Sequence, residues 1–255
     1  MSSHAAGTVS RGAGRVAELL RGSQRAVVLT GAGVSVPSGI PDFRTPGKGL
    51  WEKVNPMEVA HIDAFRRDPD RFWSFYSQRF AGLVEKRPNP AHEAIAELER
   101  RGLVRAVITQ NIDRLHRLAG SEHVVEVHGS IDACVCPECG GRVALEQVLE
   151  LIASSPTPEC SACVAVLKPD VVLFGELLPE TAMAEAHALA QEADLMVCVG
   201  SSLEVFPVAT LPGVTLEAGG RLAIVTQGPT PYDGEAEVKL TGDVVSELGA
   251  VLAAL

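Results

Sequence analysis

Short runs rich in Val, Leu, Ile and Ala alternate with helical patterns along most of this 255-residue chain. Most of these runs are apolar on both faces, which is typical of parallel strands covered by helices. The expected strands are Arg25–Thr30, Val104–Thr109, Val124–Val127, Asp170–Phe174, Leu195–Val199, Leu222–Val225 and, more weakly, Glu237–Leu240. The expected helices are Arg11–Arg21, Pro90–Arg101, Asp113–Ala119, Pro179–Glu192 and Val244–Leu255. This alternation predicts βαβ units, and therefore an α/β fold with a doubly wound, mostly parallel sheet.

Two stretches interrupt the alternation. Residues 44–90 contain no convincing strand and hold an aromatic-rich, helix-like segment, Asp70–Phe80, and residues 133–167 hold a cluster of cysteines. We expect both stretches to be insertions that together form a smaller domain, and ligands commonly bind in the cleft between two domains. The expected limits are 1–10 for a short disordered tail, 11–43, 91–132 and 168–255 for the sheet domain, and 44–90 and 133–167 for the smaller domain.

Composition and charge exclude several classes of protein. With 46% hydrophobic and 21% charged residues, the chain has the balance of an ordinary globular protein. Its longest apolar runs are six residues, whereas a bilayer span needs about 18, and its start lacks the pattern of a signal peptide. We therefore expect a cytoplasmic protein without a membrane partner. A net charge of −10 disfavours direct binding of nucleic acid, which requires a basic surface.

Two CxxC pairs, Cys136-Pro-Glu-Cys139 and Cys160-Ser-Ala-Cys163, are separated by 20 residues. Four thiolates at this spacing can close a tetrahedral shell around Zn²⁺, and cytosolic thiols stay reduced, so zinc is favoured over disulfides. Because no ligand position is left for water, we expect a structural site. Cys134 is an alternative ligand through a C-x-C pair, and Cys198 lies in a strand run and is most simply a core residue.

Polar residues and glycines follow the ends of several expected strands. Ligands bind at the carboxyl ends of strands in doubly wound folds, so we expect these residues to converge on one site. Gly31-Ala32-Gly33 alone fits either a pyrophosphate or a tight turn, since the third glycine of a dinucleotide fingerprint is missing. The residues in such positions are Gly31, Gln110, Asn111, Asp113, His128 and Gly200–Ser202.

Longer motifs carry a family resemblance. Residues 31–44 read GAGVSVPSGIPDFR, 109–113 read TQNID, 128–129 read HG, 168–176 read KPDVVLFGE and 200–202 read GSS. In this order, from about residue 25 to about residue 245, the chain resembles bacterial-type sirtuins, the NAD-dependent protein lysine deacylases, with the four cysteines in their family places. The resemblance implies a Rossmann-like NAD-binding domain, NAD as co-substrate, zinc, and the acylated lysine side chains of proteins as partners.

The resemblance also implies a role for each matching residue. His128 and Asn111 would form the catalytic centre, with His128 as general base, because imidazole titrates near neutral pH. Asn111, Ile112 and Asp113 would line the nicotinamide pocket. Thr226 stands where sirtuins usually carry Asn, so the adenosine contacts are expected to differ. The full NAD-binding set is Gly31, Ala32, Gly33, Ser35, Phe43, Arg44, Gln110, Asn111, Ile112, Asp113, Gly200, Ser201, Ser202, Thr226, Gln227, Gly228 and Val244.

A second set of residues resembles the substrate-binding positions of the family. Val172, Phe174, Gly175 and Glu176 match the segment that pairs with the substrate backbone as an added strand. Tyr76 and Arg79 match the Y-x-x-R pair of class III sirtuins, whose guanidinium and phenol suit the carboxylate of a succinyl or malonyl group. The PDFR form of residues 41–44 is instead usual in deacetylases, and an aromatic-rich helix produces a Y-x-x-R match readily. The acyl preference therefore stays open.

Three functions compete at this point. The first is a deacetylase, extended to desuccinylase and demalonylase activity, that yields nicotinamide, O-acyl-ADP-ribose and free lysine. The second is a mono-ADP-ribosyltransferase, which uses the same departure of nicotinamide, and the third is a non-catalytic module that binds zinc and NAD. The intact set of Gln110, Asn111, Asp113 and His128 argues against a non-catalytic module. Nicotinamide release that depends on the acyl group separates the deacylase from the other two functions. The missing third glycine disfavours a dehydrogenase.

Overall fold

A six-stranded parallel sheet forms the larger part of the structure, a computed structural model that describes residues 11–42, 55–155 and 157–255. The strand order is β3-β2-β1-β7-β8-β9. The chain starts at the central strand β1, adds β2 and β3 on one side, and then adds β7, β8 and β9 on the other. This order confirms the doubly wound α/β fold expected from the alternation. The strands are β1 Ala26–Thr30, β2 Ala106–Thr109, β3 Val124–Glu126, β7 Leu195–Val199, β8 Arg221–Val225 and β9 Val238–Leu240.

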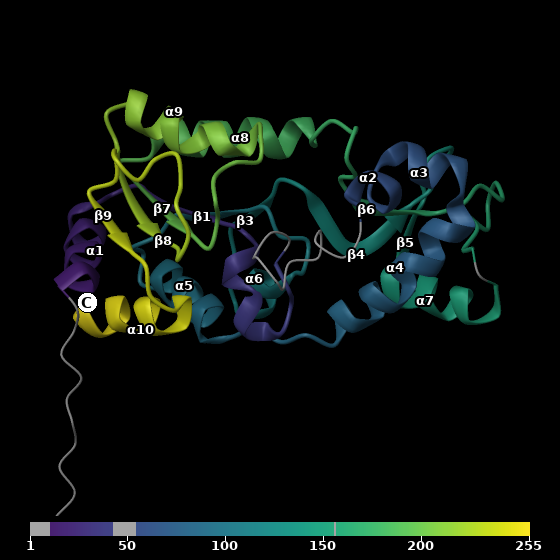
Figure 1. Cartoon of the computed structure of the whole chain (residues 1–255), viewed down its shortest axis with the longest axis horizontal. Coiled ribbons are helices and arrows are strands. Elements are labelled where there is room, and N and C mark those ends of the chain that lie inside the picture. Colours follow the sequence, from purple (N-terminus) through teal and green to yellow (C-terminus); the bar gives the residue numbers. More distant parts are fainter. Residues whose placement is uncertain (1–10, 43–54, 156) are drawn as a thin grey trace, which may run out of the picture.

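Helices cover both faces of this sheet (Figure 1). Val28, Val107 and Val197 point from one face into a core shared with α1, α5 and α10, and Leu29, Ile108 and Cys198 point from the other face toward α8 and α9. Burial on both faces explains why the strands show no polar alternation. The helices are α1 Arg11–Gly22, α5 Pro90–Arg100, α6 Leu115–Leu118, α8 Glu180–Glu192, α9 Leu211–Glu217 and α10 Val244–Ala254.

A second, three-stranded sheet of order β5-β4-β6 lies at the opposite end of the molecule from α1 and α10 (Figure 1). Its strands pair antiparallel, and its core includes Phe72, Trp73 and Phe80 of α4, with the Trp73 indole N–H donating to the carbonyl of Leu167 at 3.0 Å. The elements are α2 Pro56–Val59, α3 Ile62–Arg67, α4 Pro69–Val84, β4 Gly129–Val135, β5 Arg142–Ala144, α7 Leu145–Ser154 and β6 Lys168–Val171.

The second sheet corrects one expectation. We expected Asp170–Phe174 to be a strand of the parallel sheet, but the strand is Lys168–Val171 and it pairs antiparallel with β4. The expectation was wrong because an apolar run indicates a strand without specifying the sheet to which it belongs. The structure also contains β4, β5, α7 and α9, which were not expected. We propose that the smaller domain includes β4 and β6 whole, beyond the expected limits of 133–167. The expected tail, 1–10, lies outside the described residues.

Candidate active site and metal centre

Main-chain hydrogen bonds join the carboxyl ends of the central strands. Gly31 N–H donates to Val199 O at 3.0 Å, Gln110 N–H to Thr30 O at 3.0 Å, and Gly200 N–H to Val225 O at 2.9 Å. Each bond continues a strand ladder by one residue into the loop that follows. The loops after β1, β2, β7 and β8 therefore start at one edge of the sheet, where a doubly wound fold binds its ligands.

Gly33 and Gly200 meet backbone to backbone at this edge. The Gly33 N–H donates to Gly200 O at 2.8 Å, and a Cβ on Gly33 would lie 2.8 Å from Gly200 Cα. Gly200 has φ of +61°, and a Cβ there would clash with Val34 N. Residues without side chains are thus required in both loops. Ala32, between two glycines, is half-buried in the short 3₁₀ helix Ala32–Val34.

A buried polar cluster lies beneath this crossing. The Ser35 hydroxyl donates to Asp113 Oδ2 at 2.6 Å and accepts from Asn111 Nδ2 at 3.1 Å. Asp113 also accepts the Leu115 N–H at 3.0 Å, and Asn111 donates to Gly31 O at 3.2 Å. Burial raises the pKa of Asp113, and the Ser35 hydroxyl and the Leu115 N–H oppose that shift. The cluster therefore holds the Asn111 amide and the Asp113 carboxylate side by side.

Two buried histidines extend the cluster, and the sequence analysis did not identify them. The rings of His92 and His116 lie 4.9 Å apart at 63°. His92 Nε2 lies 3.3 Å from Ser35 Oγ, whose own proton goes to Asp113, so Nε2 is the donor. Burial lowers the pKa of His92 to about 4, and burial together with the charge of His92 lowers that of His116 to about 3. Both rings are therefore neutral, and His92 acts as a hydrogen-bond donor.

His128 directly precedes β4 and contacts Gln110, the residue before Asn111. Its Nδ1 is 2.9 Å from the carbonyl oxygen of Gln110, which can only accept, so Nδ1 carries the proton and Nε2 is the basic nitrogen. Burial lowers the pKa of His128, and the bond to Gln110 opposes the shift. The ring is thereby oriented and neutral near pH 7, as a general base requires.

Gln110 links three strand ends through its side chain. Its Nε2 donates to Ser201 Oγ at 2.9 Å and contacts Thr30 O at 3.3 Å. Ser201 is buried, and its hydroxyl also accepts the Leu203 N–H at 3.2 Å. The hydrogen bond between Gln110 and Ser201 therefore holds the loop after β2 against the loop after β7. Ser202, the next residue of the second loop, is half-buried.

The expected adenosine residues are spread over a wider area. Thr226 continues β8 through its N–H bond to Leu240 O at 3.0 Å, and Gln227 and Gly228 are exposed directly after it. Val244 is the first residue of α10 and packs against the core beneath the sheet. Phe43 and Arg44 lie outside the described residues. Ile112 packs into the core of the smaller domain and accepts the Ile131 N–H at 3.1 Å.

The expected substrate segment is already paired with its own chain. Val172 N–H donates to His128 O at 2.9 Å, and Phe174 pairs with the loop before α3 through Ala60 O at 2.8 Å and Ile62 N at 2.9 Å. Gly175 has φ of +85°, and a Cβ there would lie 2.6 Å from His61 Nε2. Residues 172–176 therefore connect the loop of His128 to the helical insertion.

Tyr76 and Arg79 lie on α4, as expected. Tyr76 is stacked on Phe80 at 5.1 Å and packs against Phe72 at 4.5 Å, and burial raises its pKa to about 12, against a smaller opposing effect of the Arg79 charge. Arg79 is exposed, with its guanidinium 3.6 Å above the Phe75 ring and Nη1 donating to Phe75 O at 2.6 Å. A carboxylate pocket at this pair stays a prediction.

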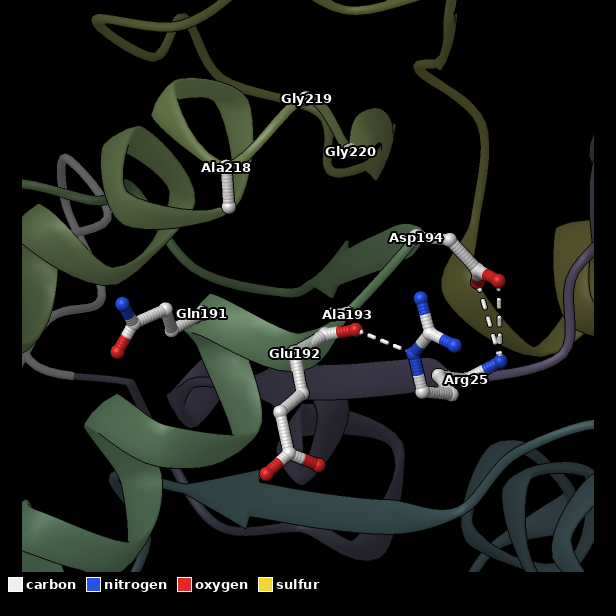
Figure 2. Close-up of a pocket in the computed structure, with 8 residues that line it drawn as sticks. All are labelled: Arg25, Gln191, Glu192, Ala193, Asp194, Ala218, Gly219 and Gly220. Atoms are coloured by element: carbon white, nitrogen blue, oxygen red, sulfur yellow. Dashed lines mark hydrogen bonds between the residues drawn. The ribbon is translucent and has the colours of Figure 1, made fainter.

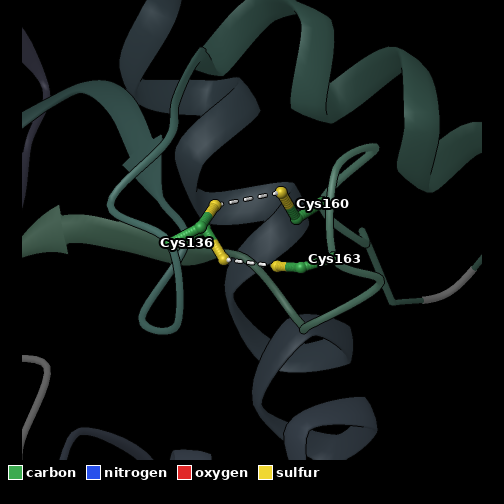
Figure 3. Close-up of side chains that lie close together, drawn as sticks. Cys136, Cys160 and Cys163 are labelled. Atoms are coloured by element: carbon green, nitrogen blue, oxygen red, sulfur yellow. Dashed lines mark hydrogen bonds between the residues drawn. The ribbon is translucent and has the colours of Figure 1, made fainter.

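The four cysteines of the CxxC pairs come together, and Figure 3 labels Cys136, Cys160 and Cys163 of this cluster. Their sulfur atoms all lie within 4.8 Å of one another, with Cys136 Sγ 3.3 Å from Cys163 Sγ and Cys139 Sγ 3.7 Å from Cys160 Sγ. A tetrahedral zinc shell with Zn–S bonds of about 2.3 Å places its sulfurs about 3.8 Å apart. The cluster therefore fits Zn²⁺, and among the described residues it leaves Cys134 out.

The two cysteine turns have the same backbone design. Gly140 N–H donates to Cys136 O and Val164 N–H to Cys160 O, both at 2.9 Å. Both donors have positive φ, +71° for Gly140 and +62° for Val164. The N–H of Cys139 is the main cause that lowers the pKa of Cys136 to about 7. Backbone amides aimed at sulfur favour the thiolate, which is the form that binds metal.

A hollow of about 460 Å³ lies at the opposite edge of the parallel sheet (Figure 2). Arg25, Asp194 and Gly220, which line it, directly precede β1, β7 and β8. Asp194 accepts the N–H groups of Gln24 at 2.9 Å and Arg25 at 3.1 Å, and Arg25 Nε donates to Glu192 O at 2.7 Å. These groups hold the strand starts in place, so we place the functional site at the carboxyl edge.

Comparison with known proteins identifies the family. The Sir2 family model matches residues 31–207. The chain is 45% identical over 228 residues to an NAD-dependent protein deacetylase of Thermotoga maritima, covering 89% of this chain and 92% of that one. It is 47% identical over 229 residues to the NAD-dependent protein deacylase 2 of Archaeoglobus fulgidus, covering 89% and 90%.

A solved structure agrees with these relatives. A Sir2 protein with a deacetylated p53 peptide and 3′-O-acetyl ADP-ribose superposes with a TM-score of 0.89 at 43% identity, covering 94% of this chain and 96% of that one. The two chains match over almost their whole lengths. The matched part of this chain includes the parallel sheet, the polar residues at the carboxyl edge of that sheet and the four-cysteine cluster. This chain belongs to the Sir2 family.

Proposed function

We propose that this chain is an NAD-dependent protein lysine deacylase that consumes NAD and releases nicotinamide, O-acyl-ADP-ribose and free lysine. One observation carries the proposal: His128 Nδ1 is held by Gln110 O at 2.9 Å, so the basic Nε2 is directed away from that contact as a neutral base. The activity printed for the relatives of Thermotoga and Archaeoglobus supports it. Its partners are proteins with acylated lysines.

Each group of the site has a distinct task in this reaction. Bound NAD supplies an electrophilic ribose carbon with nicotinamide as its leaving group. The Asp113 carboxylate, held by Ser35, accepts from the carboxamide of nicotinamide, while both Nδ2 protons of Asn111 are used to join Gly31 O and Ser35 Oγ. His128 accepts a proton at Nε2, and the neutral state imposed by burial keeps that nitrogen available. Cys136, Cys139, Cys160 and Cys163 would hold Zn²⁺ as a structural ion.

Two further properties follow from charge and chemistry. The net charge of −10 supports protein rather than nucleic acid as the partner class. Four thiolates that bind zinc require a reducing compartment, which supports action in the cytoplasm.

Mass spectrometry of the enzyme with NAD and acetyl-lysine or succinyl-lysine peptides tests the reaction. We expect free lysine, nicotinamide and O-acyl-ADP-ribose in equal amounts, and a His128→Ala variant that folds and binds NAD but turns over about 10²–10⁴ times more slowly. Nicotinamide release without dependence on the acyl group, with ADP-ribose attached to protein, would instead assign a mono-ADP-ribosyltransferase. Binding of NAD without turnover would assign a non-catalytic module.

The acyl preference is tested with Arg79→Met and its neighbour Phe75→Leu. If Arg79 receives the acyl carboxylate, Arg79→Met lowers succinyl turnover severely and spares acetyl turnover. Phe75→Leu is the matched control, because it removes the ring beneath Arg79 while keeping the charge. Equal loss of both activities, or no change, assigns Arg79 to packing on Phe75 and makes the protein a plain deacetylase.

A further inference from the structure

Lys168, the first residue of β6, directs its ammonium group back over its own segment. Nζ donates to Val171 O at 2.7 Å and to Pro169 O at 3.2 Å, and it forms an ion pair with Glu176 Oε2 at 2.9 Å. The two side chains are only 16% and 25% exposed. A charged pair shielded to this degree, with further hydrogen bonds to its members, holds its geometry better than a surface ion pair.

The Glu176 carboxylate that pairs with Lys168 also closes a tight turn formed by residues 173–176. Oε2 accepts the Leu173 N–H at 2.8 Å, and the Glu176 N–H donates to Leu173 O at 3.0 Å. Gly175, the third residue of this four-residue turn, has the positive φ of +85° that a type II turn needs. Glu176 is an expected substrate residue, and its Oε2 is engaged by Lys168 and Leu173 within the chain.

The turn spans the region between His128 and the helical insertion. Its first neighbour, Val172, donates to His128 O at 2.9 Å, and Phe174 exchanges bonds with Ala60 and Ile62. Meanwhile the His128 ring is held separately, by Gln110 O. A loosened turn would therefore displace the expected peptide-binding segment, while the bond to Gln110 O still orients the His128 ring.

We propose that Lys168 and Glu176 are positioning residues that preorganise the segment 172–176 for the acylated peptide, an inference that rests on the deacylase function proposed above. The half-buried ammonium holds the carbonyl of Val171, directly before the segment, and the carboxylate of Glu176 at its end. A segment ordered before binding loses less conformational entropy when a peptide strand is added. The pair thus acts on peptide affinity and not on the chemical step.

The test compares Lys168→Met, Glu176→Gln and the double variant with Arg142→Met. Arg142 pairs with Asp170 at 2.6 Å, so its variant removes an exposed ion pair from the same strand without touching the turn. The readouts are the KM for an acetyl-lysine peptide, the KM for NAD, kcat, the pH profile and the anisotropy of a labelled peptide. Glu176→Gln preserves side-chain shape, which keeps the test valid where Lys168→Met folds poorly.

We expect each single variant to raise the peptide KM about 10-fold, with the NAD KM, kcat and pH profile close to wild type. The double variant should bind peptide no more weakly than either single variant, because the two side chains act as a unit. Lys168→Arg, which restores the charge, should recover part of the affinity.

An unchanged peptide KM, an equal rise in both KM values, or the same effect from Arg142→Met would overturn the inference. If the wild-type enzyme releases no free lysine, the deacylase function fails by itself. The anisotropy measurement still reports whether Lys168 and Glu176 govern peptide binding, so the two failures are distinguishable.

Discussion

The Ser35 hydroxyl donates to the Asp113 carboxylate at 2.6 Å, and both side chains are almost completely buried. Ser35 belongs to the glycine-rich loop after β1, whereas Asp113 follows β2, so this one bond couples two loops of the proposed NAD site. It also orders Asn111 and His92, which both donate to the same hydroxyl oxygen.

Ser35→Ala should therefore impair NAD use and stability together. The substitution removes one of two donors from Asp113 and one of two acceptors from Asn111, and it leaves His92 Nε2 without its acceptor, at a cost of about 1–3 kcal/mol for a buried group left unpaired. We expect a raised KM for NAD and a lowered free energy of unfolding in urea. Ser154→Ala, which removes an exposed hydroxyl from the end of α7, should change neither. Wild-type nicotinamide exchange in Ser35→Ala would refute the coupling.

The pH dependence of turnover should report His128. Burial lowers its pKa, so the basic form persists below the usual value of about 6.5. We expect kcat/KM for the peptide to be flat at pH 7 and above and to fall only below the usual imidazole pKa, by up to about tenfold per pH unit. Steady-state assays across this range with a single peptide test it. A fall that begins above pH 7 would contradict a lowered pKa.

Acid should destabilise the fold through His92. Its pKa is about 4 in the folded state and about 6.5 when unfolded, so the unfolded chain binds the extra proton between these values. Stability is complete above pH 6.5 and is lost as the pH falls toward 4, by about 2 kcal/mol between pH 7.5 and pH 5. His92→Gln should reduce the loss seen in urea unfolding by that amount. The control His123→Gln, at an exposed residue, should not.

Loss of zinc should unfold the smaller domain and only thereby stop turnover. Cys136→Ser and Cys160→Ser each break a shell of four thiolates, so we expect about one zinc ion fewer per chain and a lower melting temperature. Metal analysis of the purified protein measures this directly. Cys134→Ala, at a buried residue outside the cluster, should keep its zinc. Zinc-free protein with full activity would exclude a structural ion.

The two cysteine turns offer a matched pair of substitutions. Val164 adopts φ of +62° where Gly140 occupies the equivalent place at +71°. A β-branched residue is strained there, so Val164→Gly should raise the free energy of unfolding by about 0.5–1 kcal/mol, and Gly140→Ala should lower it by about 1 kcal/mol. No atom lies within 4 Å of a Cβ built on Gly140, so the effect is purely conformational. Urea titration of the zinc-loaded protein measures both changes.

Sequence patterns predicted the parts of this structure that depend on local order. The apolar runs identified all six strands of the parallel sheet, and the CxxC spacing predicted a cluster whose sulfurs lie within 4.8 Å. The pattern failed at β6, because an apolar strand reads alike in parallel and antiparallel sheets. It also missed His92 and His116, which approach each other only after α5 and α6 pack. Nothing local distinguishes a buried neutral histidine from a surface one.

The backbone crossing of Gly33 and Gly200 limits how this chain can diversify. Neither position accepts even a methyl group. A Cβ at either glycine would clash with main-chain atoms, so no second substitution to a smaller side chain could remove the clash. Any drift, natural or engineered, toward a different dinucleotide must therefore leave the crossing intact. Substitutions are tolerated more easily in the residues after β8. Gln227 and Gly228 are exposed there, and Thr226 already departs from the family pattern.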